Sequence, residues 1–114
     1  MDTTLGELTS DVIRFRDERD WSQFHNPKNV AISLTLEAAE LLELVQWTPE
    51  ADLPAQLDRE RAGQELSDVL WWVLLLAHDL DIDLASAFKA KLALNAVKYP
   101  VEKARGSSAK YTDA

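Results

Sequence analysis

The chain has 114 residues, of which 46% are hydrophobic and 28% charged, and its formal net charge is −8. That length suits one domain with a modest core, and 3 glycines with 4 prolines favour helices over many short strands. The acidic charge excludes a nucleic-acid backbone as partner, because binding one relies on Lys and Arg. With no cysteine, disulfides and thiolate chemistry are excluded as well. We read no signal peptide, and the apolar run 69–77 is too short to span a bilayer, so a cytoplasmic protein without membrane contact is expected.

The first helix is predicted over residues 5–19. Thr4 and Glu7 have the spacing of a capping box, and apolar residues follow at helical spacing. The polar linker behind it, 20–27, keeps Trp21, Phe24 and His25. Aromatic residues in a linker indicate that the segment folds back onto the rest of the chain. They would pack either on the hydrophobic core or at a functional site, and the sequence does not decide between these two.

The second helix is predicted from Asn26, a good N-cap, to about residue 45, and the third over 59–79. The proline-containing, acidic segment between them should be a surface connection and a place for local mobility. The third helix is apolar on nearly every face, which predicts burial on several sides and favours an oligomer. Trp71 and Leu75 are the candidates for the subunit contact, with a core within the chain as the alternative.

The fourth helix should begin after Asp83 and end at Tyr99, because the residue before a proline resists helical geometry. Leu84, Phe88 and Leu92 are predicted to form its core stripe, and Lys91, Asn95 and Lys98 form a polar stripe on the same helix. Residues 101–114 are predicted to be an extended tail. The sequence thus predicts one all-α domain over 1–114, with four helices in a bundle-like, oligomeric arrangement.

Two carboxylate pairs lie inside the apolar helices, Glu37-x-x-Glu40 and Glu65-x-x-Asp68. Residues three apart point to one side of a helix, so each pair holds like charges together in apolar surroundings. A hard divalent cation with oxygen ligands would compensate them. The alternative is a solvated acidic face. A di-iron bundle is excluded, because it needs a histidine three residues after a glutamate, which the chain lacks.

These parts favour metal-assisted attack of water on a phosphoryl group. The acids can hold Mg²⁺, the Lys/Asn stripe can bind phosphate oxygens, and tryptophan rings can stack on a base. No glycine-rich phosphate loop is present, which excludes a P-loop NTPase, and no Ser-His-Asp or Cys-His arrangement is visible.

The acid motif resembles that of the all-α NTP pyrophosphatases, the MazG-like superfamily. Further segments are similar to signatures of its dCTP pyrophosphatase branch. They are ERDWSQFH at 18–25 with Pro27 and Asn29, Gln46-Trp47, ELSDVL at 65–70, Asn95 with Lys98-Tyr99-Pro100, and SSAKYT at 107–112. The resemblance covers about residues 8–112.

This resemblance implies hydrolysis of a nucleoside triphosphate to the monophosphate and pyrophosphate, with Mg²⁺ or Mn²⁺ as cofactor. The metal ligands and catalytic residues would be Glu37, Glu40, Glu65 and Asp68. The resemblance also implies dimers or tetramers with sites near subunit contacts. The substrate-binding residues would be Trp21, His25, Trp47 and Trp72 around the base, and Lys91, Asn95, Lys98 and Tyr99 toward the phosphates and sugar.

The substrate expected from the branch is dCTP or a modified, dCTP-like nucleotide, removed from the nucleotide pool. Trp72 stands where the branch often has a tyrosine, which leaves the base preference open. The alternatives are a dUTP or broad-specificity (d)NTP pyrophosphatase, or a non-catalytic nucleotide-binding helical module.

Overall fold

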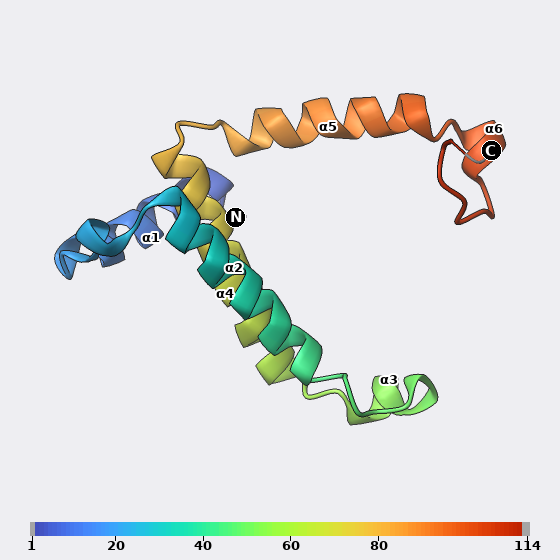
Figure 1. The fold of residues 1–114 in the computed structure, drawn as a ribbon, viewed down its shortest axis with the longest axis horizontal. Helices are drawn as coiled ribbons and strands as arrows, with labels where there is room; N and C mark the ends of the chain where they lie inside the picture. The colour runs from blue at the N-terminus through green and yellow to red at the C-terminus, as the bar shows by residue number, and fades with distance from the viewer. Residues whose placement is uncertain (1, 113–114) are drawn as a thin grey trace. The chain divides into compact units, whose positions relative to one another are not determined.

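The computed structural model describes residues 2–112, which form six α-helices, two short 3-10 turns and no strand (Figure 1). The all-α prediction is confirmed. The chain divides into two compact units, Met1–Asp81 and Ile82–Ala114, each of which is described by itself. None of the described helices has the length and apolar character needed to cross a membrane.

Helix α1, Leu5–Glu18, begins as its sequence predicts. The Thr4 side chain accepts a hydrogen bond from the backbone N–H of Glu7 at 3.1 Å, which satisfies a donor that the first turn leaves free. After α1 the backbone turns through Asp20, whose φ of 54° lies in the left-handed region, into the 3-10 turn η1, Trp21–Phe24. This turn carries the chain back toward the next helix.

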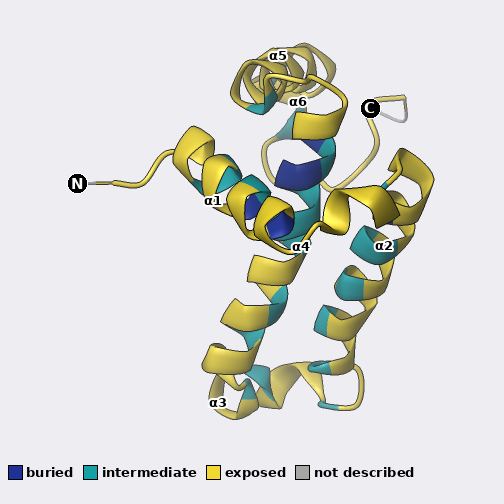
Figure 2. Cartoon of the chain, turned by 90° about the vertical axis from the view of Figure 1, so that its left-hand side faces the viewer, coloured by how far each residue is buried: buried dark blue, intermediate teal, exposed yellow. Residues whose placement is uncertain are grey.

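Helix α2, Pro27–Glu43, and helix α4, Arg59–Asp79, lie side by side and run antiparallel (Figures 1 and 2). Asn26 and Asp58 cap them, each accepting a bond from a backbone N–H three residues on. The predicted surface connection between them holds two short elements that the sequence analysis did not anticipate, η2, Glu50–Asp52, and α3, Leu53–Gln56. The pairing of α2 with α4 is what brings the two acidic motifs together.

The buried apolar core of the first unit is small and lies where α1 crosses α4 (Figure 2). Its buried apolar members are Val12, Val30, Leu74, Leu75 and Ala77. Leu75 is 0% exposed, so the prediction that it forms a subunit contact is wrong: its own chain already covers it. A helix that is apolar on most faces does not reveal from sequence which face its own chain covers.

The second unit consists of α5, Leu84–Lys98, and α6, Val101–Ala104. Asp83 caps α5 as predicted, accepting a bond from the Ser86 N–H at 3.1 Å. The tail expected to be extended begins with α6 and then turns at Gly106, where φ is 76° and a side chain would be strained. Phe88, expected in the core, is 67% exposed and finds no cover within its own unit.

Candidate metal and nucleotide site

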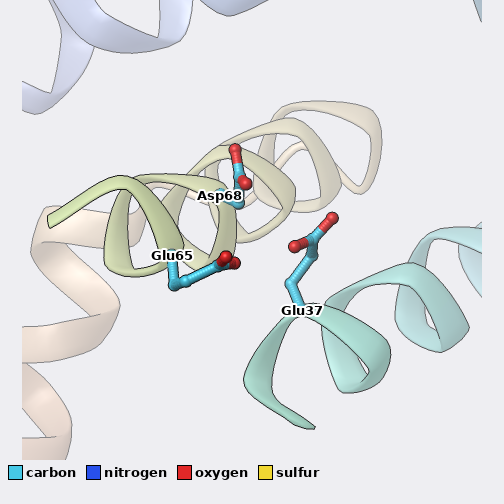
Figure 3. A group of neighbouring side chains, drawn as sticks. All are labelled: Glu37, Glu65 and Asp68. Atoms are coloured by element: carbon cyan, nitrogen blue, oxygen red, sulfur yellow. The ribbon is translucent and has the colours of Figure 1, made fainter. Parts of the chain in front are cut away.

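Three carboxylates from two helices converge between α2 and α4 (Figure 3). Glu37 comes from α2, and Glu65 and Asp68 come from α4. One oxygen from each lies within 4.8 Å of the others. Glu37 and Glu65 are half-buried and Asp68 is exposed, so the cluster opens to solvent on one side. Carboxylate oxygens at this spacing are the donors that a hard divalent cation takes.

The cluster carries uncompensated negative charge. One carboxylate oxygen of Glu37 and one of Glu65 are buried with no hydrogen-bond partner. Partial burial raises the pKa of Glu37, and the carboxyls of Glu40, Asp68 and Glu65 raise it further. Partial burial also raises the pKa of Glu65, and the carboxyls of Glu40 and Asp68 raise it further, against a smaller opposing effect of Arg61. A bound cation would remove this repulsion, because it would supply the missing positive charge.

Glu40 lies at the edge of this group. Its carboxyl is near enough to Glu37 and to Glu65 to raise the pKa of both. It is not among the three acids whose oxygens gather within 4.8 Å. The structure therefore brings three of the four predicted ligands into one cluster and places the fourth beside it.

An aromatic pair stands one helical turn from the acids. Trp72 follows Asp68 by four residues on α4 and so lies on the same face of the helix. The ring of His25 meets it edge to face, with centroids 5.5 Å apart and planes at 83°. Two of the predicted base-binding residues, 47 positions apart in the chain, thus contact each other beside the acid cluster.

Residues 32–114 match the MazG-like family. The chain belongs to that family, as its motifs predicted. It is 42% identical to dCTP pyrophosphatase 1 of Bos taurus, over 96% of this chain and 68% of that protein. The human protein of the same name is 41% identical, over 96% of this chain and 67% of its own length.

A solved structure agrees with this assignment. The crystal structure of a pyrophosphatase from Archaeoglobus fulgidus superposes with a TM-score of 0.80 at 36% identity, over 88% of this chain and 95% of that one. The MazG-like chain therefore shares its fold, as well as its sequence motifs, with pyrophosphatases.

Two other predicted base-binding residues lie elsewhere in the MazG-like chain. The Trp21 ring packs on Phe15 at 5.7 Å, and Phe15 in turn packs on Trp71 at 5.0 Å, so Trp21 belongs to a second aromatic cluster. Trp47 is 86% exposed and follows the C-terminal end of α2, ten residues beyond Glu37. His25 precedes the N-terminus of α2, so Trp47 follows the opposite end of that helix. Their contact with a substrate stays a prediction.

The predicted phosphate-binding residues of the MazG-like chain all lie in the second unit. Lys91, Asn95, Lys98 and Tyr99 follow one another along α5 and its C-cap. The Lys98 ammonium lies 5.2 Å from the centre of the Tyr111 ring, and the rings of Tyr99 and Tyr111 meet edge to face at 5.9 Å. The tail thus folds back onto the end of the polar stripe, while the stripe's role toward phosphates stays a prediction.

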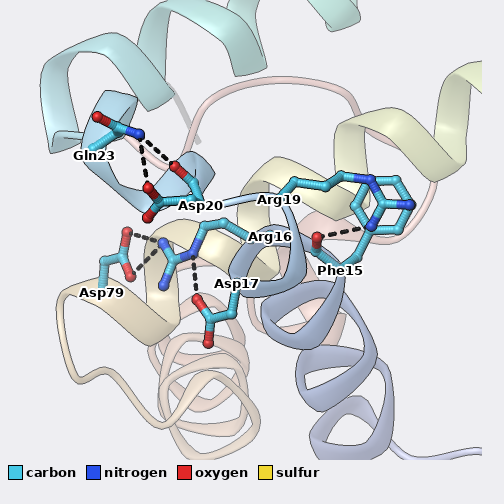
Figure 4. A network of polar contacts seen from close by, with 7 residues as sticks. All are labelled: Phe15, Arg16, Asp17, Arg19, Asp20, Gln23 and Asp79. Carbon is cyan, nitrogen blue, oxygen red and sulfur yellow. Dashed lines mark hydrogen bonds and ion pairs between the residues drawn. The ribbon is translucent and has the colours of Figure 1, made fainter.

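One polar contact of the MazG-like chain had no sequence signal at all. Arg16, on α1, is buried and pairs with Asp79, at the end of α4, 63 residues away (Figure 4). Helical spacing places Arg16 beside Val12 on the buried face of α1, but it does not reveal the partner. Arg16 and Asp79 also lie close enough to His25 to act on its pKa, which connects them to the aromatic pair.

Proposed function

We propose that this chain is a Mg²⁺-dependent nucleoside triphosphate pyrophosphohydrolase that converts dCTP, or a modified dCTP-like nucleotide, to the monophosphate and pyrophosphate. The observation that carries the proposal is the cluster of Glu37, Glu65 and Asp68, with two buried carboxylate oxygens that no donor satisfies. The proposed class of enzyme, a pyrophosphatase, is the one that the names of the chain's relatives share. The proposed role is to clear unwanted deoxynucleoside triphosphates from the cytoplasmic pool.

Glu37, Glu40, Glu65 and Asp68 would hold the metal. A donor set of carboxylates alone suits Mg²⁺, or Mn²⁺, better than a metal that prefers nitrogen or sulfur. When bound, such a cation neutralises phosphate charge and lowers the pKa of a coordinated water. The half-exposed cluster leaves one side open, so the ion could contact protein and triphosphate together. A carboxylate oxygen that does not bind the metal would accept a proton from the attacking water.

The base would meet the His25–Trp72 pair. An aromatic wall contributes stacking, and the imidazole adds a hydrogen-bonding edge that can distinguish one base from another. The assignment to dCTP is supported by the two mammalian relatives named above, both called dCTP pyrophosphatase 1. Lys91, Asn95, Lys98 and Tyr99 are proposed to contact the phosphates and sugar.

A homodimer or homotetramer is proposed as the working form. Leu36, Leu42 and Leu66 of the first unit are each more than half exposed, and apolar surface of that extent is typical of a protein interface. A second copy of the chain would cover it. It would also let Trp47 and Trp21 of one subunit approach the site of another, since neither lies at the His25–Trp72 pair of its own chain.

The proposal is tested by incubating the purified chain with each NTP and dNTP and detecting pyrophosphate, with and without Mg²⁺. We expect metal-dependent pyrophosphate release, highest with dCTP or a modified, dCTP-like nucleotide. Asp68→Asn should abolish it, whereas Glu60→Gln, an exposed acid in the first turn of the same helix, should leave it intact. A chain that binds nucleotides but releases no pyrophosphate from any of them would refute the catalytic proposal.

A further inference from the structure

One ion pair fastens the end of α1 to the end of α4 (Figure 4). Arg16 is 7% exposed, and its Nη1 donates to both carboxylate oxygens of Asp79, at 2.9 and 2.8 Å. Among the side-chain hydrogen bonds of residues 2–112, these are the ones that join residues more than four apart in sequence. A buried ion pair adds little net stability because both charges lose water, but it fixes geometry. The role of this ion pair therefore lies in the segment that it positions.

The segment that it anchors is the turn between α1 and α2. Arg16 lies in the last turn of α1, and from there the chain passes through Asp20 and η1 to His25. The turn is braced within itself, since the Gln23 side chain donates to the backbone oxygen of Asp20 at 2.9 Å and to its carboxylate at 3.1 Å. A braced turn moves as one piece with the helix end that carries it. Fastening Arg16 to α4 thus sets where His25 lies.

His25 is the residue on which this arrangement converges. Its ring rests edge-on against Trp72, and its Nδ1 is buried with no hydrogen-bond partner. Partial burial lowers the pKa of His25, the Arg16 guanidinium lowers it further, and the Asp79 carboxylate raises it. The charged groups that act on the ring therefore come from α1 through Arg16 and from α4 through Asp79. Packing and charge together favour one neutral imidazole in one orientation.

We infer that Arg16 and Asp79 are positioning residues for base selectivity: their ion pair holds the His25 ring in one orientation against Trp72 at the base-binding wall. The inference rests on the proposed function. An imidazole held in one orientation presents one nitrogen to the base at one fixed position, so it pairs with one pattern of base groups and leaves the wrong base unpaired. A ring free to turn would accept either pattern. Selectivity is then set by two residues that do not touch the substrate.

The kinetic test compares base preference in four variants, each assayed with the preferred dNTP and with the next best. Asp79→Asn and Arg16→Met should raise KM for the preferred nucleotide and lower the preference ratio by about tenfold, with kcat changed much less, because the chemistry at the acids is untouched. Arg16→Lys should keep most of the preference, since a single nitrogen of Arg16 makes both contacts to Asp79. The control is Arg14→Met, which removes an exposed ion pair to Asp11 on the same helix and should behave as the unaltered chain.

A spectroscopic readout accompanies the kinetics. The chain has 2 histidines, so a His78→Gln variant assigns the imidazole NMR signals and the titration of His25 can be followed directly. Because Arg16 lowers the pKa of His25 and Asp79 raises it, Arg16→Met should move that pKa up and Asp79→Asn should move it down. A role confined to stability would lower the melting temperature of both variants without these opposite displacements.

This inference would be overturned if the unaltered chain turned over nucleotides and the folded Asp79→Asn and Arg16→Met variants kept the same preference ratio. The proposed function would then still stand. No turnover by the unaltered chain on any nucleotide would instead refute the proposed function. If Arg16→Met fails to fold, the test rests on Asp79→Asn. That variant is expected to fold, because it keeps the shape of the side chain and one acceptor oxygen. Identical His25 titrations in Asp79→Asn and the unaltered chain would then count against the inference.

Discussion

Glu37→Gln should stabilise the metal-free protein while it removes the response to Mg²⁺. Glu37 faces two other carboxylates, and one of its oxygens lies within 4.8 Å of an oxygen of each. Two unit charges 4.8 Å apart repel by about 0.9 kcal/mol in water and by about 3.5 kcal/mol at an effective dielectric constant near 20. Because Glu37 is half-buried beside solvent, the value near that of water applies. Removing the repulsion from two neighbours should then raise the free energy of unfolding of the metal-free Glu37→Gln protein by about 1–2 kcal/mol.

The assay is thermal unfolding of the metal-free and Mg²⁺-loaded proteins. For a domain of this size, a gain of about 1 kcal/mol raises Tm by roughly 4 °C. The unaltered chain should gain stability when Mg²⁺ is added, by about 2.7 kcal/mol at a hundredfold excess over Kd, because the ion binds the folded state. The Glu37→Gln protein should gain far less stability from Mg²⁺. The control Glu60→Gln should stay within about 0.5 kcal/mol of the unaltered chain and keep its metal response.

The pH dependence gives an independent check. The folded state raises the pKa of Glu37 above its ordinary value of 4.5, so the folded protein holds that proton more tightly than the unfolded chain does. Stability from this group is therefore present below pH 4.5 and is lost as pH rises through the raised pKa. The advantage of Glu37→Gln should be largest at neutral pH and shrink on acidification. A Glu37→Gln protein that is less stable without metal, yet gains as much from Mg²⁺ as the unaltered chain, would refute the reasoning.

Three further predictions address the substrate and the assembly. Trp47→Ala should raise KM more than it lowers kcat, by a stacking loss of about 1–3 kcal/mol, in steady-state assays on dCTP; unchanged kinetics would exclude Trp47 from the base site. Lys98→Ala should lower kcat/KM about equally for all triphosphates, because a phosphate contact carries no base information; a change confined to one base would contradict this role. Leu42→Glu, at a side chain 56% exposed on α2, should shift a dimer or tetramer toward monomer in analytical ultracentrifugation, and a monomeric unaltered chain would remove the basis of the assembly proposal.

Features with local signals were predicted well from the sequence. The caps at Thr4, Asn26 and Asp83 depend on residues three apart, and each is present in the structure. The acid spacing depends on helical periodicity within one element, and the antiparallel pairing of α2 with α4 brings three of those acids together. In each case the information needed lies within one turn of the residue concerned, or in a pattern that only a helix satisfies.

Features set by long-range packing were not predictable in the same way. The Arg16–Asp79 pair joins positions 63 apart, and neither residue stands in a motif. Leu75 was assigned to a subunit contact because α4 is apolar on most faces, and choosing among those faces requires knowing where α1 crosses. Trp21 and His25 are four residues apart in the chain but contact different rings. Trp21 packs on Phe15 and His25 on Trp72, and this choice likewise depends on long-range packing.

The burial along α4 is uneven, and this has a consequence for how the molecule opens. Its buried residues, Leu74, Leu75 and Ala77, all lie near its C-terminal end, whereas the stretch that carries Glu65 and Asp68 has none. Regions with few buried contacts open locally at a free energy below that of global unfolding. Amide hydrogen exchange should therefore be slow around Leu75 and progressively faster toward Arg59. A cation that bridged α2 and α4 would slow exchange in the looser half of the hairpin, and would thus stabilise the end that the apolar core does not reach.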